Sequence, residues 1–177
     1  LTKVPYDLAC GDVIVTGPKS AAKIRFRQTL MTMSSYSRIE IKDEVMKNEG
    51  PSLIEVSYGK LRSFFSKPKQ LEKKGAQTGL RVKTPTAVAG VRGTDFYMGF
   101  DPNSNTTTQA TLKGAVEVEQ VNTGEKVEVV EGQQVVVKEN AKAPESVTAG
   151  ASPAPTHATS SLVVGPIVSE TVEQIRN

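Results

Sequence analysis

Short runs in which apolar and polar residues alternate extend along most of this sequence. In residues 22–27, Ile24 and Phe26 fall on one side of an extended chain, and the lysine and arginines fall on the other. The same alternation recurs, with many β-branched residues, in 39–41, 54–58, 80–82, 96–100, 116–118, 127–129 and 135–137. A period of two residues is that of a strand with one buried and one solvated face. The chain is therefore predicted to be all-β.

Turn-forming residues separate these runs. Strands that follow one another every 8–12 residues or so are typical of a sandwich, a barrel or a solenoid. The tripeptide "NTG" (122–124) is predicted to form the tip of a hairpin, with Gly124 at positive φ. A length of 177 residues suits one domain. We therefore expect a single domain of short strands in a sandwich- or solenoid-like stack. The separators are 16–18, 48–51, Gly59, Gly79, 101–103, 122–124 and Gly132.

The composition changes near residue 140. Residues 140–160 are rich in Ala, Pro, Ser and Thr, and such a segment buries too little apolar surface to offset its ordering entropy. We expect an all-β domain over 1–139 and a polar tail over 140–177, with 140–160 irregular and cut first by proteases. The apolar "LVVGPIV" (162–168) is a candidate docking strand. Helix is expected only near 69–74 and 169–176. Because the chain opens on Leu1, we expect it to be processed or cut from a longer one.

The sequence offers little that could carry catalysis or hold a metal. Cys10 and His157 are the single cysteine and histidine, and His157 lies in the polar tail. A nucleophile–base pair or a zinc site needs such residues clustered and rigidly held. No catalytic, cofactor-binding or metal-binding residue is therefore predicted. No run reaches the roughly 18 apolar residues of a transmembrane helix, so no membrane span is expected within the chain.

The charge balance is mildly basic, with a net charge of +3 and a pI near 9.0. Basic residues alternate with apolar ones and form no continuous stripe along the sequence, so nucleic acid is not an expected partner. Trp is absent and aromatic residues make up 5%, which argues against a stacking platform for sugars or single strands. The densest basic patch, "KPKQLEKK" (67–74), is interpreted as a solvated loop.

The stretch "TPTAVAGVRGTDF" (84–96) carries two glycines, three threonines and a proline, but nothing resembling an activated nucleophile or a phosphate loop. Pro85 removes a backbone donor and favours an extended Thr84, as at a strand end or edge. Ala87, Ala89 and Gly90 are small, which suits close approach to a neighbouring layer. The stretch is therefore interpreted as architecture.

The second half of this stretch is predicted to be a tight turn into a strand that starts near Thr94. Gly93 supplies positive φ, and Val91 and Phe96 anchor the segment in the core. Arg92 is interpreted as a clamp whose guanidinium binds turn carbonyls, and an exposed contact with a ligand is the alternative. The residues singled out, as structural rather than catalytic, are Thr84, Pro85, Gly90, Val91, Arg92, Gly93, Thr94 and Phe96.

This stretch resembles the hallmark of the FecR-like domain family: a strand, "TP", small apolar residues, "VRGT", an acidic residue and Phe. Other segments fit in order: "GDVIVTGPKSAAKIRF" (11–26), "LMTMSSYSRIEI" (30–41), "IEVSYGKLR" (54–62), "LKGAVEVE" (112–119) and "VVEGQQVVV" (129–137). The resemblance covers about residues 10–138. The combination is far more specific than any one segment.

The resemblance implies a mostly β domain of the bacterial periplasm or cell surface that binds other proteins and has no catalytic activity. The best-known members are transmembrane regulators, in which a cytoplasmic segment controls a sigma factor and the envelope part responds to an outer-membrane transporter. This chain shows neither the cytoplasmic segment nor a membrane helix. We therefore expect a non-enzymatic envelope interaction module, such as a signalling or regulatory component.

The expected partner of this module is another envelope protein, contacted through strand edges and the 66–78 loop. The alternative is a carbohydrate- or peptidoglycan-associated scaffold of the envelope, against which the missing Trp counts. The sequence names neither the partner nor the oligomeric state.

Overall fold

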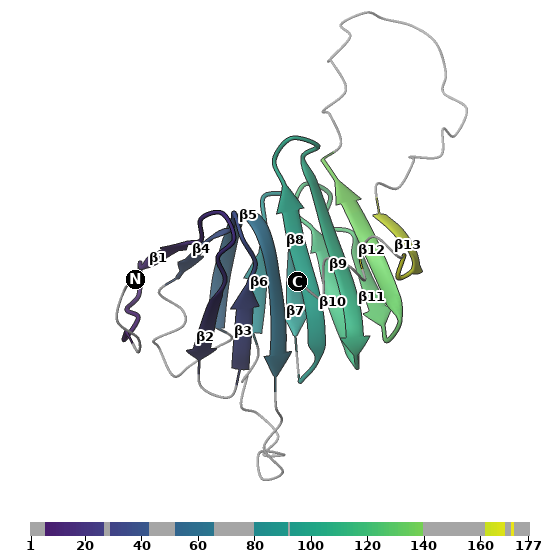
Figure 1. Ribbon diagram of the computed structural model, residues 1–177. Helices are drawn as coiled ribbons and strands as arrows, with labels where there is room; N and C mark the ends of the chain where they lie inside the picture. Colours follow the sequence, from purple (N-terminus) through teal and green to yellow (C-terminus); the bar gives the residue numbers. More distant parts are fainter. Residues whose placement is uncertain are drawn as a thin grey trace, which may run out of the picture.

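The computed structural model describes residues 6–26, 29–42, 52–65, 80–91, 93–139, 162–168 and 171. The elements of these residues are strands throughout, which confirms the prediction of an all-β single domain (Figure 1). The strands are β1 (Val13–Val15), β2 (Ala22–Phe26), β3 (Thr29–Met33), β4 (Arg38–Ile41), β5 (Ser52–Phe65), β6 (Leu80–Lys83), β7 (Ala87–Val91), β8 (Asp95–Asp101), β9 (Thr106–Lys113), β10 (Ala115–Gln120), β11 (Lys126–Val130), β12 (Gln133–Lys138) and β13 (Leu162–Pro166).

The strands form two layers that share one long strand. The first layer, sheet A, runs in the order β1-β4-β5-β6-β7-β10-β11, and the second layer, sheet B, runs β2-β3-β5-β8-β9-β12-β13. Successive pairs of strands alternate between the two sheets, so the chain repeatedly turns a corner between the layers. Every described pairing is antiparallel except that of β5 with β6.

β5 belongs to both sheets because it bends at Gly59. Its first half pairs with β4 and β6 in sheet A, and its second half pairs with β3 and β8 in sheet B. Gly59 has φ of +91°, and the pairing of β4 with β5 shifts register beside it, between Arg38 and Ile39. The sequence prediction that Gly59 separates two strands is wrong. A glycine at positive φ lets one continuous strand change layers instead.

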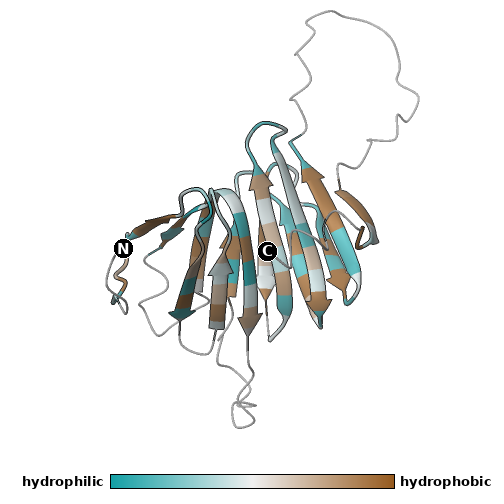
Figure 2. Cartoon of the chain, in the orientation of Figure 1, coloured by the Kyte–Doolittle hydropathy of each residue, from teal (hydrophilic) through white to brown (hydrophobic). Residues whose placement is uncertain are grey.

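The hydrophobic core lies between the layers and is one cluster. Alternate residues of most strands point into it, as the period-two pattern predicts, and Figure 2 shows hydrophobic and hydrophilic residues alternating along the strands. Its largest fully buried apolar side chains are Phe96, Met31, Met33, Ile39, Ile54, Leu61, Leu80 and Met98. The predicted hairpin is present, since β10 pairs with β11 and Gly124 in its turn has φ of +69°.

The alternation fails at β8, where both faces are buried. Phe96 and Met98 point into the core as predicted, but Tyr97, expected on the wet face, is only 2% exposed. Tyr97 is in register with Ala110 of β9, which is in register with Gln134 of β12. The hydroxyl of Thr171 donates to Gln134 Oε1 at 2.7 Å, and both residues are buried. Thr171 therefore packs on this outer face.

β13 is the candidate docking strand, and it docks on the body. It pairs antiparallel with β12, from Leu162 opposite Val137 to Pro166 opposite Gln133. The predicted irregular segment 140–160 and the predicted helix at 69–74 lie outside the described residues. Of the predicted helix at 169–176, Thr171 alone is described, and its conformation is helical.

Candidate functional site

The hallmark stretch 84–96 lies where the chain passes from sheet A to sheet B. Its first half forms β7 in sheet A, and its last residues begin β8 in sheet B. Val91 and Phe96 are buried in the core on either side of the corner, as predicted. Gly93 at the corner has φ of +73°, the backbone conformation expected of it. Arg92 lies outside the described residues, so its clamp role stays a prediction.

Gly90 does not have the position that the sequence suggested. Ala87 and Ala89 are fully buried and face the other layer, whereas Gly90 points to the outer face of sheet A. A β-carbon on Gly90 would meet only the carbonyl oxygen of Glu117, at 3.9 Å. Close approach of the layers therefore depends on the alanines.

The threonines of the "TPT" segment join the two layers through a buried hydroxyl cluster. Thr107 Oγ1 of β9 lies 2.7 Å from Thr84 Oγ1 and 2.6 Å from Thr86 Oγ1. Thr84 also closes a tight turn, because its Oγ1 accepts from the N–H of Ala87 at 3.0 Å and its own N–H donates to Ala87 O at 2.8 Å. All three threonines are buried. The cluster is a structural tie with no access to a ligand.

Thr94, at the end of the "VRGT" segment, differs from these threonines. Its side chain is buried, and its Oγ1 has no hydrogen-bond partner among the described residues. Thr94→Val removes a desolvated hydroxyl and keeps the branched shape. We expect the free energy of unfolding to stay unchanged or to rise by up to about 1 kcal/mol in urea titrations.

Thr84→Val is the matched control for this substitution, because it deletes a hydroxyl that is fully bonded. It should lower the free energy of unfolding by about 1–3 kcal/mol. A comparable loss in Thr94→Val would contradict the interpretation of Thr94 as a residue without a structural hydrogen bond.

The edge of sheet A at β1 is the described surface best suited to contact another protein. Among the described strands, β1 pairs with β4 alone. The Thr16 N–H and the Asp12 carbonyl both bond toward β4, so in an antiparallel ladder the main-chain groups of Val13 and Val15 point away from it. The side chains of Val13 and Val15 are 43% and 58% exposed. β1 therefore presents open main-chain groups beside apolar side chains, which is the arrangement that accepts an added strand.

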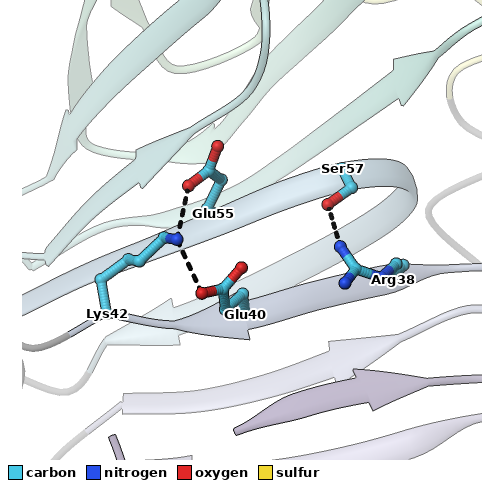
Figure 3. A network of polar contacts seen from close by, with 5 residues as sticks. All are labelled: Arg38, Glu40, Lys42, Glu55 and Ser57. Atoms are coloured by element: carbon cyan, nitrogen blue, oxygen red, sulfur yellow. Dashed lines mark hydrogen bonds and ion pairs between the residues drawn. The ribbon is translucent and has the colours of Figure 1, made fainter. Parts of the chain in front are cut away.

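A polar network lies beside this edge on the outer face of sheet A (Figure 3). Lys42 Nζ is 2.7 Å from Glu40 Oε1 and 3.2 Å from Glu55 Oε2, and Arg38 donates to Ser57 Oγ at 2.8 Å. The hydrogen bond to Glu40, followed by that to Glu55, raises the pKa of Lys42 above its ordinary value. Glu40 is opposite Val13 and Arg38 is opposite Val15. The apolar edge is therefore bordered by charged groups that already have polar partners within sheet A.

Neither a metal site nor a membrane-spanning helix is found in the described part of the chain. No three metal-ligating side chains of the described residues gather in one place. These residues contain no helix that is long and apolar enough to cross a bilayer.

The fold is that of an all-β domain whose two layers are joined by a corner between β7 and β8. The family model for FecR protein matches residues 12–117 of this domain. The chain therefore belongs to the FecR family. No curated protein matches it.

Among solved structures, two crystal structures of a candidate anti-sigma factor from Parabacteroides distasonis ATCC 8503 resemble this fold. Each has a TM-score of 0.65 and 12% identity over 92% of this chain. The chain spans 63% and 62% of the length of those two neighbours. At this identity the likeness concerns the fold alone.

Proposed function

We propose that this chain is a non-enzymatic regulatory module of the bacterial envelope, which binds another envelope protein by adding that protein's strand to β1. Membership of the FecR family supports a role in signalling or regulation. The exposed apolar edge formed by Val13 and Val15 carries the proposal of strand addition. The periplasm or the cell surface is the proposed compartment.

The other sheet edges fit this role less well. β2 carries Lys23 and Arg25 on its exposed side, and charged residues at an edge discourage pairing. The exposed side of β11 carries Lys126 and Glu128. β13 includes Pro166, which has no N–H to donate. Among the described edges, β1 is the one whose exposed side chains are apolar throughout and whose main-chain donors are complete, since Val130 of β11 lies beside the charged Lys126 and Glu128.

Hydrogen exchange at single amides tests the mode of binding. When the partner binds, the amides of Val13 and Val15 should exchange at least about tenfold more slowly, because each gains a strand hydrogen bond. Protection elsewhere, with no change at these two amides, would contradict strand addition at β1.

A matched pair of variants tests the surface itself. Val15→Lys should weaken partner binding by about tenfold or more and leave the melting temperature within about 2 °C, because the side chain is exposed. Val130→Lys is the control, since Val130 is 43% exposed at the opposite edge of sheet A. Equal loss in both variants would show that β1 is not the contact. Binding to purified peptidoglycan in place of a protein would favour the scaffold alternative.

A further inference from the structure

The outer face of sheet B brings together basic residues that are scattered in the sequence. Lys23 and Arg25 of β2, and Lys60 and Arg62 of β5, alternate with core residues and therefore lie on this face. β2 and β5 flank β3, so these cations lie on strands separated by one neighbour. This group could not be recognised in the sequence, because the pairing of β2 and β5 with β3 brings together residues that are far apart along the chain.

Two exposed apolar side chains lie within this basic group. Leu30 of β3 is directly opposite Arg25 on one side and Phe64 of β5 on the other. Leu30 is 41% exposed and Phe64 is 49% exposed. The next row of the same face holds Lys23, Thr32 and Arg62 in register. We name Lys23, Arg25, Leu30, Arg62 and Phe64 the basic apolar patch.

The cations of this patch lie among fewer carboxylates than those of the outer face of sheet A, which carries Glu40, Glu55, Glu117, Glu119 and Glu128. On sheet A, Lys42 is paired with Glu40 and Glu55, and Lys126 is paired with Glu117 and Glu119. On sheet B, Asp95 makes a two-point contact with Arg62, at 2.8 and 3.1 Å, which raises the pKa of Arg62. Lys23 and Arg25 have no ion pair among the described residues.

We propose that the basic apolar patch docks the domain on the surface of a bilayer that contains anionic lipids. The negative charge of lipid phosphates complements the exposed Lys23 and Arg25, whose side chains are long enough to reach phosphates from the face of a sheet. Leu30 and Phe64 supply an apolar pair that enters the boundary between headgroups and acyl chains. The patch extends over the neighbouring strands β2, β3 and β5 on one face of the sheet, so it can contact an extended charged surface such as that of a bilayer.

Co-sedimentation with vesicles tests this proposal. The protein should bind vesicles of phosphatidylglycerol and phosphatidylethanolamine, bind vesicles of phosphatidylcholine alone at least about tenfold more weakly, and release partly as salt rises. K23E/R25E should weaken binding to the anionic vesicles by about tenfold or more. The charge-matched control is R81E/K83E, which reverses two cations on the outer side of β6 in sheet A and should change binding by less than about threefold.

Further variants and competitors distinguish lipid docking at this patch from weaker or different kinds of anion binding. Equal loss in K23E/R25E and R81E/K83E would show attraction by net charge alone and overturn the patch. L30S/F64S should remove the binding that survives high salt, and unchanged binding would overturn the role of the apolar pair. Competition by millimolar inorganic phosphate would indicate that the patch contains a discrete phosphate pocket. Binding to polyglutamate without binding to vesicles would indicate that the partner of the patch is an acidic protein. Either result would overturn the proposal. Circular dichroism confirms that each variant is folded.

Discussion

Gly59→Ala is expected to lower the free energy of unfolding by about 2–6 kcal/mol, a large effect for a single methyl group. Two costs combine. The φ of +91° is one that side chains with a β-carbon rarely adopt. The added carbon would also lie 2.3 Å from Ser37 Oγ and 2.5 Å from Ser37 Cα. Because the second of these atoms belongs to the backbone, no rotation of a side chain relieves the contact.

The position of Ser37 explains why it cannot move away. Its Oγ accepts a hydrogen bond from the N–H of Lys60 at 2.9 Å, and its own N–H donates to Thr16 Oγ1 at 2.9 Å. Ser37 is fully buried and holds β5 at the point where that strand changes layers. Displacing it would break the tie between the two sheets.

Gly124→Ala is the control that isolates the contact with Ser37. Gly124 also has positive φ, at +69°, but a β-carbon there meets nothing within 4 Å. It should therefore cost only the conformational term, about 1–2 kcal/mol. Thermal melts of both variants beside the parent separate the two terms, with a shift of roughly 2–4 °C expected per kcal/mol. Equal shifts in the two variants would show that Ser37 yields at little cost.

The sequence predicted the fold class because most strands keep one apolar face. Ile24, Ile39 and Val82 each come from a different run with a period of two residues, and all three are buried. β9 is the informative failure, since it was not predicted at all. Its inward residues are Thr107, Gln109 and Thr111, which are buried and polar, so hydrophobic periodicity gives no signal there. Thr107 and Thr111 bond to groups outside β9, such as the carbonyl of Val129 for Thr111, whereas Gln109 Nε2 donates to Thr111 Oγ1 within the strand.

The candidate surfaces were less predictable than the core. Exposure of Val13 and Val15 depends on β1 being the last strand of its sheet, and strand order is not encoded in the local pattern. The basic apolar patch likewise depends on the register of β2, β3 and β5, which places Arg25, Leu30 and Phe64 in one row. The threonines of "TPT" were recognised as structural, but their partner Thr107 comes from the strand that the pattern missed.

Thr107→Val should produce the second large loss of stability, about 1–3 kcal/mol in the free energy of unfolding. The substitution keeps the shape of the side chain and removes the hydroxyl shared by Thr84 and Thr86. Thr84 Oγ1 keeps its contacts with Ala87. Thr86 Oγ1 keeps only the carbonyl of Val137, at 3.5 Å, and is 2% exposed, so it bears most of the desolvation cost.

The neighbouring Thr108→Val is the matched control, because Thr108 is on the same strand but faces outward and is only half-buried. Its effect on urea unfolding should stay within about 0.5 kcal/mol. Thr86→Val completes a double-mutant cycle: once Thr107 has lost its hydroxyl, removing that of Thr86 should cost less than it does in the parent, since no partner remains to be stranded. Strictly additive losses in the double variant, or a Thr107→Val effect as small as that of Thr108→Val, would show that the hydroxyl cluster does not join the two sheets energetically.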